Sequence, residues 1–455
     1  MPQSPFLSGN YAPVIDELEI GGLSVSGCLP SSLQGTLFRN GSNPHLPPAE
    51  PYHWFTGDGM VHAITLAGGQ ASYRNRWVRT PRFLAEDAAR QPLFAGFGRP
   101  LSEAAATLDT GVANTHVIAH AGKLLALEEA HLPTRIDPRD LSTLGYDDFG
   151  GVLSGRFTAH PKRDPATGQL VFFSYSASGP FSPGMTWGTI EADGTVSRLE
   201  RFDAPYSSMV HDFAVTAGHV VFPVLPLTGD MGRALSGQPP FAWEPSRGGF
   251  LGVMRRDSGV ASLAWQPCEP RYVFHFMNAF DAGGDVVMDV VEYDAAPFFP
   301  NADGSPPVET ESRLCRWRVD VAGAAAVRRE VLADAPGEFP RIDERRAGLP
   351  YRHGYRLGRD PASQADTIVH HDLERGSQAV FALPDGEQTS EAVFVPRRGD
   401  AAEGDGWLLS VAWRPRTDDS ALLVLDAQAV ERGPVATVTL PRRVPFGFHG
   451  SFVAE

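Results

Sequence analysis

Short apolar runs separated by turn sequences dominate the chain from end to end. Runs of four to eight residues bounded by glycine, proline or aspartate predict β-strands rather than helices. Turn sequences such as Ala67-Gly68-Gly69, Asp193-Gly194 and Gly283-Gly284 separate the runs. The expected strands lie at 35–39, 60–65, 71–78, 116–120, 124–128, 170–174, 213–224, 285–293, 314–319, 378–383, 392–396, 407–413, 422–426 and 436–440.

Helical periodicity is confined to one alanine-rich region, with helices expected at 81–95 and at 102–107. Length alone would suggest about three domains, although a closed β architecture can hold such a chain as one unit. Many short strands with one helical insertion favour a β-propeller, because a β-sandwich would use up its strands well before residue 455. We therefore expect one all-β propeller domain over residues 1–455, with an insertion at about 81–107.

Composition and charge exclude several classes of protein. The 39 basic and 54 acidic residues give a net charge of −15 at pH 7, so nucleic-acid binding is not expected. Cys28, Cys268 and Cys315 form no C-x-x-C pair and are expected as isolated, buried thiols. No apolar run approaches the roughly 18 residues that span a bilayer, and the N-terminal segment does not resemble a secretory signal. A soluble cytoplasmic protein is the expectation.

Four of the 14 histidines stand among apolar or aromatic neighbours, where a strand is expected to begin or end. They are His160, His211, His275 and His449. A propeller brings the innermost strand of every blade to one axis, so residues far apart in sequence can converge there. Four imidazoles would form a nitrogen-rich site suited to iron, copper, nickel or zinc. The alternative for each histidine alone is a core position with a satisfied hydrogen bond.

Several motifs occur in a fixed order along the whole chain. They include Gly35-Thr-Leu-Phe-Arg-Asn-Gly41, His53-Trp-Phe-Thr-Gly-Asp-Gly-Met60, Thr158-Ala-His-Pro-Lys162, His211-Asp-Phe213, Met277-Asn-Ala279 after His275, and His449-Gly450. In this combination the chain resembles the carotenoid cleavage oxygenases, iron(II) dioxygenases that split an alkene bond into two carbonyl products. The resemblance implies a seven-bladed propeller with a dome of helices and loops over the metal-bearing face, and it places 81–107 in that dome.

The resemblance also implies the residues of the site. Matching positions assign one Fe(2+) per chain to His160, His211, His275 and His449. Matching positions for carboxylates that hold the second nitrogen of the imidazoles are Glu129, Glu338 and Glu391. Such carboxylates fix the imidazole tautomer and offset the charge of the ion. No catalytic residue beyond the iron centre is expected.

The expected chemistry needs only O2 as co-substrate. Four imidazoles leave two octahedral positions for dioxygen and solvent. An electron-rich alkene would supply the reducing power, so no NAD, flavin or 2-oxoglutarate is expected, and no Rossmann or P-loop glycine pattern occurs. Two other classes stay open: a non-catalytic interaction propeller with structural histidines, and a calcium-dependent hydrolase, in which oxygen ligands would dominate the site.

Two substrate classes are compatible with the resemblance, apocarotenoids and stilbenoids or phenylpropanoids. Stilbene-cleaving members place a lysine before the first of the three glutamates and a tyrosine in the preceding dome segment. This chain has Glu128 at the first position and Leu101 nearest the second. Because a carboxylate repels a phenolate, an apocarotenoid is favoured. The segments around His275 and at 403–407 are, in contrast, similar to the stilbene and phenylpropanoid branch.

The expected partner is therefore a lipophilic or aromatic alkene. Phe55 matches a cavity-lining position of the family, and Phe276, next to His275, is a further candidate contact, as are Glu128 and Leu101. A lipophilic substrate favours weak peripheral membrane contact through segments 94–97 or 239–243, which the net acidity opposes. Monomer and dimer are both compatible with the sequence.

Overall fold

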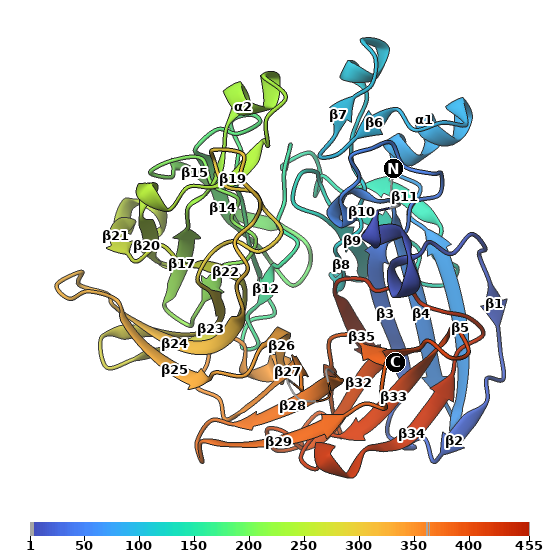
Figure 1. Cartoon of the computed structure of the whole chain (residues 1–455). Helices are drawn as coiled ribbons and strands as arrows, with labels where there is room; N and C mark the ends of the chain where they lie inside the picture. The colour runs from blue at the N-terminus through green and yellow to red at the C-terminus, as the bar shows by residue number, and fades with distance from the viewer. Residues whose placement is uncertain (1–3, 361–362, 364, 455) are drawn as a thin grey trace. The chain divides into compact units, whose positions relative to one another are not determined.

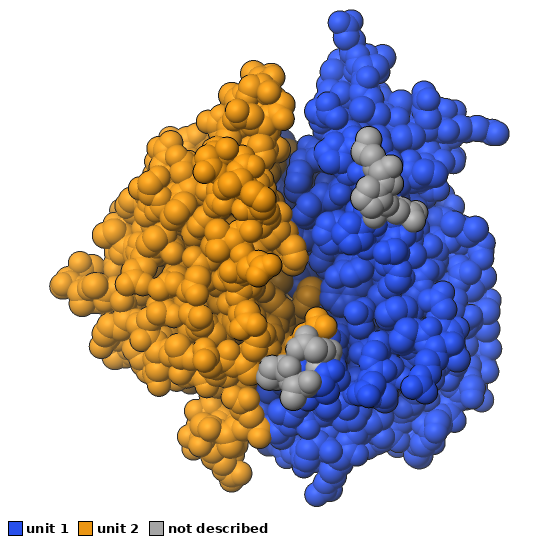
Figure 2. All heavy atoms as spheres, viewed as in Figure 1, with its two compact units in different colours: residues 1–154, 360–370, 379–455 blue, residues 155–359, 371–378 orange. Residues whose placement is uncertain are grey.

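The computed structural model describes residues 4–360, 363 and 365–454. Two compact units can be distinguished in it, coloured blue and orange in Figure 2. Unit 1 comprises 1–154, 360–370 and 379–455, and unit 2 comprises 155–359 and 371–378. The single domain expected over 1–455 stays a prediction, and its residues 1–3, 361–362, 364 and 455 lie outside the described residues.

The fold is a seven-bladed β-propeller built from antiparallel sheets, as predicted. Unit 1 contributes three sheets, whose strands follow in spatial order. The first contains β1 (Glu19–Ile20), β5 (Gln70–Trp77), β4 (Gly59–Ala67), β3 (Gly35–Ser42) and β35 (Gly450–Ala454). The second contains β11 (Thr143–Tyr146), β10 (Thr134–Ile136), β9 (Lys123–Leu127) and β8 (His116–His120). The third contains β2 (Val25–Gly27), β34 (Pro434–Thr439), β33 (Asp419–Asp426), β32 (Gly406–Arg414) and β30 (Gln388–Thr389). Strand β31 (Val393–Pro396) pairs with β32 as well.

Unit 2 contributes three four-stranded sheets. The first contains β12 (Lys162–Arg163), β13 (Leu170–Ser174), β14 (Gly184–Ile190) and β15 (Val196–Asp203). The second contains β16 (Ala214–Val215), β17 (His219–Val224), β20 (Gly249–Arg255) and β21 (Ala264–Cys268). The third contains β22 (Tyr272–Ala282), β23 (Asp285–Tyr293), β24 (Ser312–Asp320) and β25 (Arg328–Ala333). The remaining blade contains β26 (Gly337–Ile342), β27 (His353–Arg359), β28 (Asp366–Asp372) and β29 (Ser377–Ala382).

Both ends of the chain are tied into the sheets of unit 1. The C-terminal strand β35 pairs with β3 from Gly35 opposite Ala454 to Arg39 opposite Gly450, and Figure 1 shows the red strand beside the blue one. The N-terminal strand β2 pairs with β34 in the same way. Closure of this kind removes the unpaired edges that sheets otherwise expose. It also fixes the backbone at the start of β35, directly after His449.

Strand predictions succeeded where an apolar run is continuous. The predicted strands at 116–120, 170–174 and 285–293 coincide with β8, β13 and β23, whose residues are mostly buried. The prediction of one strand over 213–224 was wrong, because β16 and β17 are separated there by a turn. Thr216 Oγ1 accepts hydrogen bonds from the amides of Gly218 and His219 and reverses the chain.

The helical insertion is shorter than predicted. Helix α1 spans Pro81–Ala89, its first turn is capped by the Thr80 hydroxyl, and it ends at Arg90 in the left-handed conformation (φ 54°). The hairpin of β6 (Phe94–Ala95) and β7 (Arg99–Pro100) follows, then a 3-10 helix at Ala104–Thr107. In unit 2, α2 (Met231–Leu235) lies between β18 (Leu227–Gly229) and β19 (Phe241–Trp243). No helix among the described residues has the length and apolar character to cross a bilayer.

A buried histidine makes unit 1 sensitive to acid. His62 in β4 is 3% exposed, and its Nδ1 lies 2.7 Å from the Tyr73 hydroxyl. Burial, with smaller contributions from Arg39 and Arg442, lowers the pKa of His62 to about 3. In the unfolded chain the His62 imidazole binds a proton near pH 6.5, whereas in the folded protein it stays neutral down to about pH 3. The free energy of unfolding is therefore unaffected by His62 above pH 6.5. Between pH 6.5 and 3 it decreases by up to about 1.4 kcal/mol per pH unit as the pH falls.

Urea unfolding of the wild type and of His62→Gln between pH 7 and pH 4 measures this effect. The wild-type free energy of unfolding should fall more steeply with decreasing pH, by up to the equivalent of one bound proton. Parallel pH dependences in the two proteins would show that His62 does not stay neutral in the folded state.

Candidate metal centre

Three of the predicted histidines converge within unit 2. The Nε2 atoms of His160 and His211 lie 3.0 Å apart, and those of His211 and His275 lie 3.2 Å apart. Two imidazoles bound at about 2.1 Å and at a right angle to each other place their nitrogens about 3.0 Å apart. The three side chains therefore fit ligands of a single metal ion.

Each of the three histidines lies at or near the start of an edge strand, in three different sheets. His160 precedes β12, His211 precedes β16, and His275 lies inside β22 rather than at its end. The register of β22 with β23 shifts on both sides of Phe276, the residue that follows His275. Irregularities of this kind redirect a side chain within a strand, which explains how a histidine inside a strand joins two loop histidines.

Glu338 holds the second ring nitrogen of His275. Its Oε2 atom lies 2.6 Å from His275 Nδ1 and also accepts the backbone N–H of Phe339. Its Oε1 atom accepts the hydroxyl proton of Tyr293 at 3.1 Å. A carboxylate on Nδ1 favours a proton there, so Nε2 keeps the lone pair that faces the other two imidazoles.

Two further buried groups surround Glu338. Burial, reinforced by the Glu338 carboxylate, raises the pKa of Tyr293 well above its ordinary value, so the phenol remains a donor. Arg356 is 1% exposed, and burial lowers its pKa to about 10, with Glu338 acting in the opposite direction. A Cβ at Gly337 would lie 2.4 Å from Arg356 Nη1, so glycine makes room for the guanidinium. Sequence reasoning missed Tyr293 and Arg356, which no local motif distinguishes.

Unit 1 holds His449 in a similar way. His449 Nδ1 lies 3.0 Å from Glu391 Oε2, and the N–H of Gly450 donates to Glu391 Oε1. His449 and Glu391 are 5% and 3% exposed. Burial lowers the pKa of Arg39 to about 10, while Glu391 acts to raise it. Each unit therefore contains an imidazole fixed through Nδ1 by a buried or half-buried glutamate with a buried arginine nearby.

The other predicted site residues have varied surroundings within their units. Phe55 is half-buried in the 3-10 helix Trp54–Thr56, with ring centroids 4.6 Å from His53 and 5.8 Å from Phe448. Leu101 is 47% exposed after β7, whereas Phe276 is 5% exposed in β22. Glu129 is half-buried, two residues after the end of β9.

Glu128 is buried and engaged by its own unit. Its Oε1 atom accepts the N–H of Val112 at 3.0 Å and lies 2.8 Å from His131 Nδ1. The His131 ring is stacked on Tyr146, whose hydroxyl donates to Asp109. One carboxylate oxygen of Glu128 is thus already used for hydrogen bonding inside the protein.

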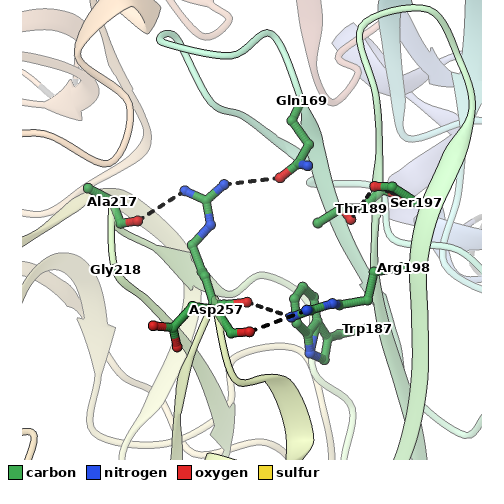
Figure 3. Close-up of a pocket in the computed structure, with 9 residues that line it drawn as sticks. Gln169, Trp187, Thr189, Ser197, Arg198, Ala217, Gly218 and Asp257 are labelled. Carbon is green, nitrogen blue, oxygen red and sulfur yellow. Dashed lines mark hydrogen bonds between the residues drawn. The ribbon is translucent and has the colours of Figure 1, made fainter.

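A separate pocket of about 500 Å³ lies in unit 2 (Figure 3). Arg256 donates to Gln169 Oε1 and to the carbonyl of Ala217, and Arg198 donates to the carbonyls of Arg256 and Asp257. These guanidinium groups are used to join neighbouring segments. None of the predicted site residues lines this pocket, and its arginines satisfy protein acceptors.

The chain is similar to known proteins over nearly its whole length. Residues 11–454 match the family described as retinal pigment epithelial membrane protein. The chain is 36% identical over 467 residues to an isoeugenol monooxygenase from Pseudomonas nitroreducens, covering 99% of this chain and 98% of that protein. It is 36% identical over 505 residues to a carotenoid cleavage oxygenase from Mycobacterium tuberculosis, covering 99% and 97%. The crystal structure of Pseudomonas brassicacearum lignostilbene dioxygenase is similar with a TM-score of 0.96 and 36% identity, covering 100% and 99%.

Proposed function

Because this chain belongs to the family of the retinal pigment epithelial membrane protein and the carotenoid cleavage oxygenases, we propose that it is an iron(II) dioxygenase. It would cleave a carbon–carbon double bond of a small lipophilic or aromatic alkene into two carbonyl products. The observation that carries the proposal is the convergence of three imidazole Nε2 atoms in unit 2. His449 of unit 1 is proposed as the fourth ligand beside His160, His211 and His275.

The chain's own groups would prepare these ligands. Glu338 and Glu391 keep a proton on Nδ1 of His275 and His449, so that both imidazoles offer Nε2 as neutral ligands. We assign Glu129 the same task toward another of the histidines. The carboxylates offset the positive charge of the ion without occupying a coordination position. Bound iron would supply the activation of dioxygen.

The reaction balances without a further reductant. The two atoms of O2 end in the two carbonyl groups, and the four electrons that reduce O2 come from the broken double bond. The proposal therefore includes no nicotinamide, flavin or 2-oxoglutarate. The remaining task of the protein is to orient the alkene, and the proposed contacts are Phe55, Phe276 and Leu101, whose aromatic and aliphatic surfaces suit an apolar substrate.

The relatives favour an aryl-substituted alkene as substrate. Two of them are named for isoeugenol and lignostilbene, and the lignostilbene dioxygenase has the TM-score of 0.96. An apocarotenoid is the second candidate. It is favoured by Glu128 and Leu101, since a carboxylate and an alkyl side chain are poor partners for a phenolate, and by the carotenoid-cleaving relative.

Aerobic incubation of the iron-loaded protein with isoeugenol, a hydroxystilbene and an apocarotenal in parallel tests both classes. We expect an aromatic aldehyde from one of the first two, with label from 18O2 in both products, and no such product from protein treated with a chelator. Aldehydes from the apocarotenal alone would support the second candidate. If iron is bound at about one per chain and no alkene is cleaved, the proposed function is contradicted.

Metal analysis of protein purified without chelator separates the other classes. Near-stoichiometric iron supports the oxygenase, whereas calcium would indicate a hydrolase with oxygen ligands. A chain that holds no metal after exposure to Fe(II) would instead be an interaction propeller with structural histidines.

A further inference from the structure

One buried carboxylate contacts all three histidine-bearing segments of unit 2. Asp212 is 2% exposed, and its Oδ1 atom lies 2.7 Å from Lys162 Nζ and accepts the N–H of Phe213 at 2.8 Å. Its Oδ2 atom accepts the N–H of Phe276 at 2.9 Å. Both oxygens are therefore occupied, and the negative charge is paired with a lysine.

These contacts lie next to the proposed metal ligands along the chain. Lys162 is two residues after His160, Asp212 itself follows His211, and Phe276 follows His275. The three segments lie in or directly before the edge strands β12, β16 and β22 of three different sheets. Ladder hydrogen bonds act within a sheet, so they do not set the separation of these segments. Asp212 links them directly, through its ion pair with Lys162 and the hydrogen bond from the Phe276 N–H.

Strand β22 is irregular at Phe276. The register of β22 with β23 shifts on either side of this residue. The Phe276 N–H donates a hydrogen bond to the Asp212 carboxylate. Hydrogen bonds to a carboxylate are shorter and stronger than those between neutral groups. The residue that follows His275 is thus hydrogen-bonded to a group from the His211 segment.

We propose that Asp212 and Lys162 are positioning residues that set the spacing of the three imidazoles and so the affinity of the site for its metal. The inference rests on the metal site of the proposed function. Without Lys162, the buried Asp212 carboxylate would lose its counter-charge and would be expected to shift toward water. Such a shift would move the segments of His211 and His275. Groups that orient ligands typically change metal affinity by about 10- to 100-fold when they are replaced.

A second ion pair of the same kind provides a matched control. Lys123 Nζ lies 2.7 Å from Asp147 Oδ2 in unit 1, with side chains 27% and 5% exposed, against 26% and 2% for Lys162 and Asp212. Neither residue lies within two positions of a proposed ligand. Asp147 Oδ2 also lies 3.8 Å from Arg135 Nε, and Lys123→Met removes the nearer of its two cations without touching the proposed metal centre.

The test is titration of apo-protein with Co(II), followed by visible absorption, together with urea unfolding of each apo-protein. We expect Lys162→Met and Asp212→Asn to bind Co(II) about 10- to 100-fold more weakly and with an altered spectrum. Lys162→Arg keeps the charge and a donor and should recover most of the affinity. Lys123→Met should lose comparable stability and keep the wild-type affinity and spectrum.

Wild-type affinity and spectrum in Lys162→Met would overturn the inference, as would equal losses of affinity in Lys162→Met and Lys123→Met. If Asp212→Asn does not fold, Lys162→Met decides the question, because it removes only the counter-charge and leaves the Asp212 carboxylate itself in the chain. A wild-type chain that binds neither Co(II) nor Fe(II) would contradict the proposed function itself. Tight wild-type binding that the substitutions leave unchanged would contradict only the positioning role.

Discussion

Replacing His211 by alanine should abolish alkene cleavage and leave the purified protein with little bound iron. Its Nε2 atom lies 3.0 Å from that of His160 and 3.2 Å from that of His275, so it is the central member of the group. Loss of groups that only orient ligands already costs about 10- to 100-fold, and we expect at least about 100-fold for a ligand. Iron per chain, measured by mass spectrometry, and initial rates of aldehyde formation check this.

His219→Ala is the control for that experiment. His219 in β17 of the same unit also pairs with a carboxylate, with Nδ1 2.7 Å from Asp281 Oδ1. It is not one of the proposed ligands, so this variant should keep both its iron and its rate. If His211→Ala only lowers the melting temperature and retains iron and turnover, His211 is a structural histidine.

Replacing Glu391 by alanine should weaken metal binding and destabilise unit 1 together. The Glu391 carboxylate accepts hydrogen bonds from His449 Nδ1 and from the N–H of Gly450, and it lies near the buried charge of Arg39. Each buried donor left without a partner costs about 1–3 kcal/mol, so a total loss of several kcal/mol is expected. Release of the His449 ring should add about a 10- to 100-fold loss of metal affinity.

Glu391→Gln separates the two effects. Its amide oxygen can replace one of the two accepted hydrogen bonds, so it should recover part of the stability while the metal affinity stays low. Urea unfolding of apo-protein and Co(II) titration measure the two quantities, with Glu431→Ala at an exposed position as the control. Wild-type metal affinity in Glu391→Ala would remove Glu391 from the proposed metal centre.

Much of the fold could be predicted because buried strands have a simple sequence signature. Continuous apolar runs such as Leu170–Ser174 are buried on both faces and leave little ambiguity. Strand β15 at Val196–Asp203 escaped prediction because it alternates half-buried and exposed residues and carries four charged side chains. The turn after β16 was missed because a threonine hydroxyl, rather than an evident glycine–proline pair, reverses the chain there.

By itself the sequence determined the all-β class, the propeller, the family and the four candidate histidines. Short apolar runs bounded by turn residues predict the strands, and short motifs in a fixed order indicate the family and its histidines. The family resemblance also indicated Glu338 and Glu391, but only the tertiary structure decided which histidine each of them holds. Glu338 lies 63 positions from His275, and Glu391 lies 58 positions from His449. The amide that Asp212 accepts belongs to Phe276, 64 positions away. Hydrogen bonds over such separations depend on where the strands of a propeller end in space, and no local pattern of residues records that.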